Sequence, residues 1–485
     1  MDRTAGTAGT HDDEVLPLSV GQEGLWLLHE LAPDSSTYHL AGGGRMEPAP
    51  DPELLARAVL ALTERHPMLR SVYLETPAGP RRMVREPGTI GALTVRQVPD
   101  ADDEELRRLV AEETARPFRL STEGPFRAVL LLREGDAVLL VTTHHIATDA
   151  TSQWLIWRDL LDAYEALAYG KEPGWDPVGS GYEEFVAAEQ ALLDSPRGTR
   201  QAEYWREQRT GSEPAELPTD RPRPAHSAGT GASLVRRLPD QLSERVRRTA
   251  ADQGVSQFAL ALGALQALVN RWTGQTDFLI ACPASVRRSA ARNVVGYFVN
   301  PVLIRGRLDR GTTLGEAMAA ANERIRQSTA RVTYPYPLVA QAAPATGPLY
   351  RISMTMVTTD RFGPGLGGAV SGEAIDVGGI STTYLEIPHL EGQCDLAVEV
   401  TRDVYGLTLA LRYDTELFER DTAERLFDQF ERFIAAAADR PGTRIGRIPL
   451  TDEAERRALL ELSGSAGSGT RGSGTRGSGT QGLAS

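Results

Sequence analysis

Two adjacent histidines and a nearby aspartate form the most chemically distinctive cluster in this sequence. His144 and His145 are followed, four residues after the second histidine, by Asp149. An imidazole gains and loses a proton near neutral pH, so it serves as a general acid or base or positions a nucleophile. A carboxylate within a turn of a buried histidine requires a partner of its own. The cluster therefore indicates chemistry in which a proton is moved or a nucleophile is aligned.

The segments around the cluster predict a strand, a turn, a second strand and a helix. Residues 126–133 alternate well enough for a strand, residues 134–136 form a turn, and residues 137–143 are nearly all apolar. After Asp149, apolar and aromatic residues recur at helical spacing, at Trp154, Trp157, Leu161, Tyr164 and Ala168. The histidines therefore lie where a buried strand ends, a place where catalytic groups are often held.

Neighbouring side chains of a strand point to opposite faces, so the two histidines are not expected to serve one atom together. One of them should face a channel, and the other should pack behind it. This geometry also argues against a metal site, because the ligands of a metal must converge. A pair of ordinary core histidines is the alternative that the spacing alone leaves open.

The pattern His-His-x-x-x-Asp resembles the active-site signature of the condensation domains of nonribosomal peptide synthetases, which are relatives of chloramphenicol acetyltransferase. Ala150 stands where that family usually has glycine. Its backbone N–H keeps any donor role of the position, but its methyl group narrows the channel.

Further segments resemble the family in the right order along nearly the whole chain. They cover residues 16–26, 65–70, 182–185, 271–277 with Pro283 and Arg287, 295–300 and 334–337. A seventh segment, from residue 350, matches only at its start. Substrate contacts in the second half of the chain are therefore the least transferable part of the resemblance.

The resemblance implies an α/β fold with two chloramphenicol-acetyltransferase-like lobes, arranged as a V-shaped pseudo-dimer with the active site in the channel between them. A chain of 485 residues also exceeds what one core usually supports. We predict a disordered N-terminus (1–14), an N-terminal lobe (15–175), a C-terminal lobe (176–462) and a Gly/Ser/Thr-rich flexible tail (463–485). We expect a free-standing protein, with a piece of a larger synthetase as the alternative.

Composition limits the classes of partner. A net charge of −13 provides no overall electrostatic footprint for nucleic acid. No apolar run approaches the ~20 residues of a membrane span, and the acidic N-terminus lacks a secretory signal pattern. Two cysteines are too few for a disulfide framework, so a cytoplasmic location is expected.

The chemistry that the resemblance implies is acyl transfer. The donor would be an acyl or aminoacyl thioester on the phosphopantetheine arm of a peptidyl or acyl carrier protein, and the acceptor an amine or a hydroxyl. No directly bound cofactor and no metal are expected. Amide and ester formation are equally open.

Each residue of the site receives an expected role by its position in the family pattern. His145 is the catalytic imidazole, and His144 supports it structurally. Asp149 should form a bidentate pair with Arg287 from the second lobe. Three further residues are candidates for the channel wall: Tyr297, Asn300 and Ser152.

Other functions share parts of this pattern. A non-catalytic module that recruits tailoring enzymes tends to lose the second histidine, which is present here as His145. A heterocyclising relative would carry aspartate in place of His144. We see no second-lobe acid motif of an epimerase. A coenzyme A-dependent acyltransferase shares the fold and the motif, and fold alone does not exclude it.

Overall fold

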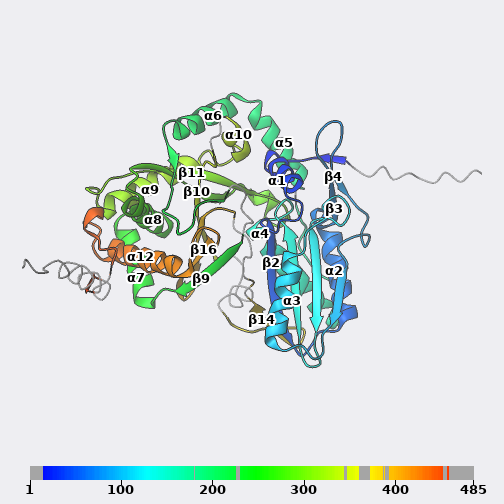
Figure 1. The fold of residues 1–485 in the computed structure, drawn as a ribbon. Coiled ribbons are helices and arrows are strands. Elements are labelled where there is room, and N and C mark those ends of the chain that lie inside the picture. The colour runs from blue at the N-terminus through cyan, green and yellow to red at the C-terminus, as the bar shows by residue number, and fades with distance from the viewer. Residues whose placement is uncertain are drawn as a thin grey trace, which may run out of the picture.

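The computed structural model contains two α/β lobes that lie side by side (Figure 1). It describes residues 15–179, 181–224, 230–342, 347–359, 372–385, 387, 393–451 and 456–457. The predicted disordered ends, 1–14 and 463–485, lie outside the described residues. In the described part of the chain, no helix combines the length and apolar character needed to cross a bilayer.

The N-terminal lobe is built on a six-stranded sheet with three helices against its faces and a fourth beside it. The strand order is β13 (Ile375–Val377), β14 (Ile380–Leu385), β2 (His39–Glu47), β7 (Ala137–His144), β6 (Phe126–Leu132) and β5 (Leu93–Gln97). Its helices are α1 (Val20–Leu31), α2 (Pro52–Arg65), α3 (Asp103–Ala115) and α4 (Ala150–Ala168). A small sheet of β1 (Val15–Pro17), β4 (Arg81–Val84) and β3 (Ser71–Leu74) completes the lobe.

Strand β7 is apolar on both sides because helices cover both faces of the sheet. Leu139 and Val141 belong to the main core beneath α2 and α4. Val138 and Leu140 face the other way and pack with residues of α3. The strand therefore ends with its two faces in different surroundings, which separates the two histidines that follow.

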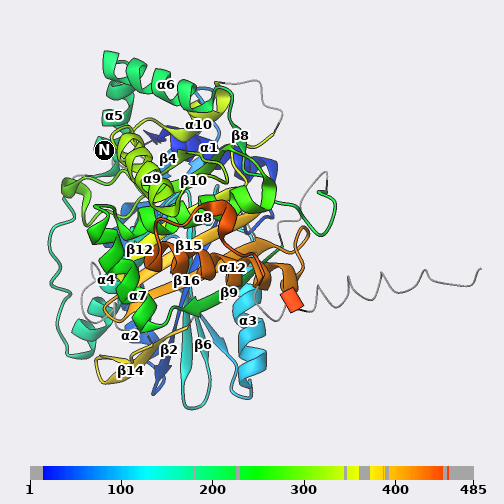
Figure 2. The ribbon, with the colours of Figure 1, turned by 90° about the vertical axis from the view of Figure 1, so that its left-hand side faces the viewer.

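The C-terminal lobe contains a seven-stranded sheet. The order is β11 (Val299–Arg307), β10 (Asp277–Ser285), β12 (Ile352–Thr358), β15 (Leu396–Asp403), β16 (Gly406–Asp414) and β9 (Gly231–Arg237), with β8 (Glu213–Pro214) paired to β10. Helices α7 (Asp240–Asp252), α8 (Gln257–Thr273) and α12 (Arg420–Asp439) cover the outer face (Figure 2). Helix α9 (Leu314–Thr329) packs on α8 and β11. Helices α5 (Tyr182–Leu193), α6 (Pro196–Arg209) and α10 (Tyr336–Gln341) lie at one end of the two lobes (Figure 1).

Three segments that follow the predicted boundary at residues 175 and 176 pack against the N-terminal lobe. Tyr182 and Val186 of α5 belong to the core of the N-terminal lobe. Residues 291–298 also contribute to that core, although they follow β10 of the other lobe. Strands β13 and β14 cross back and pair with β2. These segments are buried against the N-terminal lobe although they follow the predicted boundary in the sequence.

Candidate active site

His144 is the buried member of the histidine pair. Its side chain is 2% exposed and lies among aromatic rings, with ring centroids at 5.5 Å from His29, 6.2 Å from His39 and 6.1 Å from Phe118. The backbone N–H of Ile146 donates to Nδ1 of His144 at 3.1 Å. Burial, followed by the neighbouring histidines, holds the pKa of His144 well below its usual value. The His144 ring is therefore buried, held in its neutral form and, unlike His145, not among the described residues that line the cavity.

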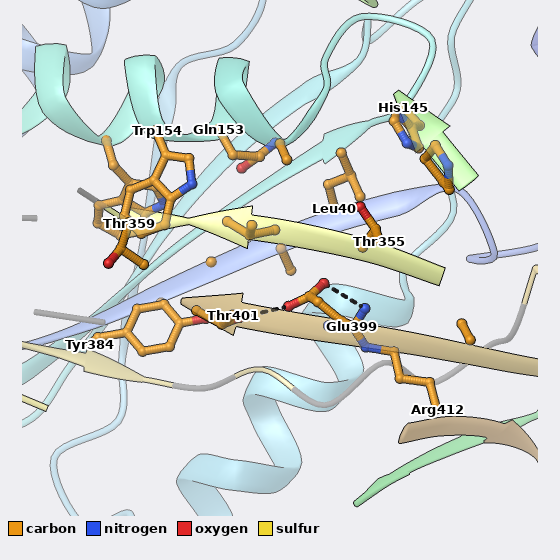
Figure 3. Close-up of a pocket in the computed structure, with 18 of the residues that line it drawn as sticks. Leu40, His145, Gln153, Trp154, Thr355, Thr359, Tyr384, Glu399, Thr401 and Arg412 are labelled. Carbon is orange, nitrogen blue, oxygen red and sulfur yellow. Dashed lines mark hydrogen bonds and ion pairs between the residues drawn. The ribbon is translucent and has the colours of Figure 1, made fainter. Parts of the chain in front are cut away.

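His145 faces a cavity between the lobes (Figure 3). Its Nδ1 lies 2.6 Å from the carbonyl oxygen of Thr148, so Nδ1 carries the proton and donates it. The lone pair of the neutral ring is then on Nε2. Burial lowers the pKa of His145, although the Thr148 carbonyl and the Asp149 carboxylate act in the opposite direction. A neutral imidazole with a basic Nε2 at the cavity is suited to accept a proton from a bound nucleophile.

The ring of Tyr297 limits the space around His145. The two ring centroids are 5.4 Å apart at an interplanar angle of 80°. A β-carbon on Gly21 of α1 would come within 2.6 Å of the Tyr297 ring, so the absence of a side chain there lets helix α1 approach. Tyr297 thus borders His145, but it is not among the described residues that line the cavity, so its expected place on the channel wall stays a prediction.

Asp149 and Arg287 form the predicted ion pair between segments far apart in the sequence. Arg287 Nη2 lies 2.9 Å from Asp149 Oδ1, and the two side chains are 7% and 4% exposed. The carboxylate also caps α4 by accepting the N–H of Ser152 at 2.7 Å, and it accepts the N–H of Phe298 at 3.1 Å. One carboxylate therefore ties the start of α4 to the segment that follows β10.

The pair is not bidentate, which corrects the expected geometry. Arg287 Nη2 also donates to the Ser152 hydroxyl at 2.8 Å, while Nη1 donates to the carbonyls of Ala291, at 2.9 Å, and Val294. The guanidinium spreads its donors over one carboxylate, one hydroxyl and two carbonyls because the chain folds around it.

Two residues expected along the channel have other positions. Ser152 is fully buried, and its hydroxyl donates to the carbonyl of Gly296 at 2.8 Å. Asn300 uses its amide to fix the loop before α10, donating to the carbonyls of Val332 and Tyr334 at 2.8 Å each. Neither residue is among the described residues that line the cavity. Their polar groups satisfy backbone atoms, a use that the spacing of residues does not distinguish from substrate binding.

Segments distant in sequence hold the loop after the histidines and the helix α4 that follows it. The amide of Gln22 on α1 donates to the carbonyl of Ile146 at 2.8 Å. Asp159 on α4 lies 2.7 Å from Arg65 Nε and 2.8 Å from His66 Nε2. Burial alone would raise the pKa of Asp159, but the hydrogen bonds from His66 and Arg65 lower it to about 2. These contacts give structural roles to two of the motif segments, 16–26 and 65–70.

The cavity has a volume of about 390 Å³ and lies between β2 and α4 of one lobe and β12, β15 and β16 of the other. Its N-terminal wall contains His145, Ala150, Gln153, Trp154, Trp157 and residues 40–44 of β2. The opposite wall includes Ser353, Thr355, Glu399, Thr401 and Arg412. Ala150, the first residue of α4, is exposed here. Among the described residues, no group of three or more His, Cys, Asp or Glu side chains is placed to hold a metal ion.

The charged and hydroxyl groups of the second wall were not predicted from the sequence, although Pro283 and Ser353, which lie in segments that resemble the family, also line the cavity. Thr355, Glu399 and Arg412 carry no motif, but alternate residues of β15 are apolar core residues (Leu396, Val398 and Val400). That alternation was the available signal, because the residues between them must point away from the core.

Comparison with known proteins decides the family. A family model described as "Condensation domain" matches residues 12–460. The chain belongs to the condensation-domain family. Condensation domains are enzymes of the acyltransferase type that form amide bonds.

The similar proteins are much longer than this chain. The phosphinothricin tripeptide synthetase PhsC of Streptomyces viridochromogenes is 30% identical over 463 residues, which cover 93% of this chain but 42% of PhsC. The malpinin synthetase of Mortierella alpina is 27% identical over 463 residues, with 93% of this chain and 6% of the synthetase covered. The condensation domain therefore spans less than half of these relatives.

Solved structures share the two-lobed fold. The X-domain from teicoplanin biosynthesis, solved in complex with OxyB, matches with a TM-score of 0.79 and 25% identity, covering 93% of this chain and 99% of that one. The first condensation domain of the calcium-dependent antibiotic synthetase matches with a TM-score of 0.74 and 22% identity, covering 90% and 100%. The predicted α/β fold of the chloramphenicol acetyltransferase type is confirmed.

Proposed function

We propose that this condensation domain transfers an acyl or aminoacyl group from the phosphopantetheine thioester of a carrier protein to an amine or hydroxyl acceptor. The observation that carries the proposal is the orientation of His145. Its Nδ1 donates to the Thr148 carbonyl at 2.6 Å, which leaves the basic Nε2 for a substrate in the cavity between the lobes.

The reaction moves one proton from the acceptor to the leaving sulfur, and His145 alone can carry it. The acceptor nitrogen or oxygen attacks the thioester carbonyl carbon, and its proton passes to Nε2. As the new C–N or C–O bond is completed, the C–S bond breaks and the sulfur takes a proton from Nε2. A thiol on the carrier arm and a neutral imidazole result, so the enzyme returns to its starting state.

The start of helix α4 supplies a second contribution to this mechanism. Ala150 lines the cavity and is the first residue of α4, where backbone N–H groups carry the partial positive charge of the helix. An N–H at this end would stabilise negative charge on the thioester oxygen during attack. The Asp149 carboxylate does not compete for the substrate, because Ser152, Phe298 and Arg287 already bind it.

A recruitment module is the second candidate function. The teicoplanin X-domain, solved with OxyB, is similar over 93% of this chain. The presence of His145 beside a cavity favours catalysis over recruitment alone, because a surface that only docks a partner needs no imidazole there.

Intact-protein and small-molecule mass spectrometry would test both candidates. A carrier protein loaded with a panel of aminoacyl groups is offered amine and alcohol acceptors together, with the same acyl groups on coenzyme A as a parallel donor. We expect the wild type to transfer from the carrier and His145→Ala to lose transfer, with the product showing whether an amide or an ester forms. Transfer only from coenzyme A would contradict the carrier donor. Carrier binding without any transfer would favour recruitment.

A further inference from the structure

The C-terminal wall of the cavity carries a charge pair. Arg412 Nη1 lies 3.2 Å from Glu399 Oε2, and the two side chains are 30% and 25% exposed. They are the only charged side chains among the described residues that line the cavity. A partly buried ion pair is weak evidence for stabilisation, because removing charges from water offsets much of their attraction. Stability therefore does not explain why the Glu399–Arg412 pair lies in the cavity, and a role in binding substrate would explain it.

Strand register explains why Glu399 points toward the substrate space. Glu399 is paired with Thr355 of β12 and with Ala410 of β16. Its neighbours Val398 and Val400 are buried in the core on the opposite face. Figure 3 shows the Glu399 carboxylate on the wall opposite Gln153 and Trp154 of α4.

The carboxylate of Glu399 has acceptor capacity left within the described residues. Arg412, a diagonal neighbour across the strand pair, contacts one oxygen through a single nitrogen. The other oxygen has a long contact of 3.5 Å with the Thr401 hydroxyl. A carboxylate accepts about four hydrogen bonds, so it has room for a further donor without giving up Arg412.

The surroundings favour a cation rather than an anion as that further donor. The indoles of Trp154 and Trp157 line the same cavity, and aromatic faces attract cations. The chain as a whole carries a net charge of −13, which raises the local concentration of cations and repels anions. A free carboxylate on the substrate would meet Arg412 but would also face Glu399 beside it.

We propose that Glu399 binds the ammonium group of an aminoacyl donor, whose hydrocarbon part packs against Trp154 and Trp157. The ammonium is not the nucleophile, because the nucleophile must reach His145 on the opposite wall as a neutral group. This inference rests on the proposed function and narrows its donor to the class of acyl groups that carry a free, protonated amine.

Binding of two unreactive probes tests the inference without turnover. One probe is phenylalanine joined to pantetheine through an amide in place of the thioester, and the other is 3-phenylpropanoic acid joined in the same way. They differ only in the amino group. Calorimetry at pH 6.5 should show that the wild type binds the amino probe at least about tenfold more tightly, the size of one charge-assisted hydrogen bond.

Variants assign the preference to one side chain. Glu399→Gln should remove the preference by weakening only the amino probe, and Glu399→Asp should keep part of it. Arg412→Gln should leave the amino probe bound at least as tightly as in the wild type. Equal affinity of the wild type for the two probes, or equal weakening of both by Glu399→Gln, would overturn the inference.

The wild type alone provides a second test that does not depend on a variant folding. An α-amino group loses its proton at a pH of about 8, so the preference should decline between about pH 7 and 9. A preference that persists unchanged at pH 9 would contradict recognition of the ammonium. A protein that prefers the amino probe but transfers no donor in the carrier assay would retain this inference and lose the proposed function.

Discussion

The wall of the cavity that carries His145 and the wall that carries Glu399 face the same space but hold their polar groups differently. Behind the first wall, Asp149, Ser152 and Arg287 are buried and bind one another. On the second wall, hydroxyls and one ion pair project from alternate positions of strands into the cavity. A group that must hold one orientation through a reaction needs such buried support, whereas groups that select a substrate need to be accessible.

The difference between the two walls predicts that the largest effect of a substitution is on the rate of acyl transfer, and that it occurs at His145. His145→Ala should reduce the rate of acyl transfer by about 10² to 10⁴-fold, the usual contribution of a positioned acid–base group. The thermal unfolding midpoint should stay close to that of the wild type, because the side chain faces the cavity. Rapid-quench measurement of transfer, with His145→Gln as the variant that keeps a polar side chain, would check this. A loss below about tenfold would make the imidazole a minor contributor.

The second largest effect is expected on the stability of the protein, from a substitution of Arg287, which is buried behind the wall that carries His145. Arg287→Ala should lower the free energy of unfolding by about 3–5 kcal/mol, because it leaves the Asp149 carboxylate buried without its charge partner. Urea denaturation measures the change. The exposed neighbour Arg288 is the matched control, and Arg288→Ala should shift stability by no more than about 0.5 kcal/mol. Normal stability of Arg287→Ala with only weaker substrate binding would contradict the bracing role.

The smallest effect concerns the glycines of β2 on the first wall. A β-carbon on Gly42 would lie 2.6 Å from the Trp157 indole nitrogen, so Gly42→Ala should destabilise the protein by about 1–3 kcal/mol. Gly44 on the same strand is the control. Its β-carbon would meet Thr382 at 3.4 Å and Trp157 at 3.5 Å, an ordinary contact, so Gly44→Ala should be neutral or slightly stabilising. Equal effects of the two substitutions in thermal denaturation would show that the first wall is not tightly packed.

The sequence predicted the first wall better than the second. The apolar strand before His144 and the helix after Asp149 were both predicted, because local periodicity determines them. The partner of Asp149 was found through the family pattern, but the single-nitrogen geometry depends on how Ala291 and Val294 fold around Arg287. No local signal carries that information.

The second wall could be predicted from the sequence even less well than the first. Glu399 and Arg412 become part of a site only because β12, β15 and β16 pair in one register and face the other lobe. The return of β14 to the sheet of the N-terminal lobe was also missed, since pairing with β2 depends on contacts more than 300 residues apart in the sequence. Ser152 and Asn300 were placed on the channel because polar residues near a motif do not show whether they bind substrate or backbone.

The most direct test of the account is the pH dependence of kcat/KM for transfer, corrected for the fraction of acceptor that is unprotonated and for the fraction of donor whose amino group is protonated. The lowered pKa of His145 predicts that the wild-type value stays level from pH 8 down to about 6.5, the usual pKa of histidine, and falls only below it. His145→Ala should show no such fall. A wild-type profile that already declines above pH 6.5, or one that His145→Ala reproduces, would contradict a neutral His145 as the proton acceptor.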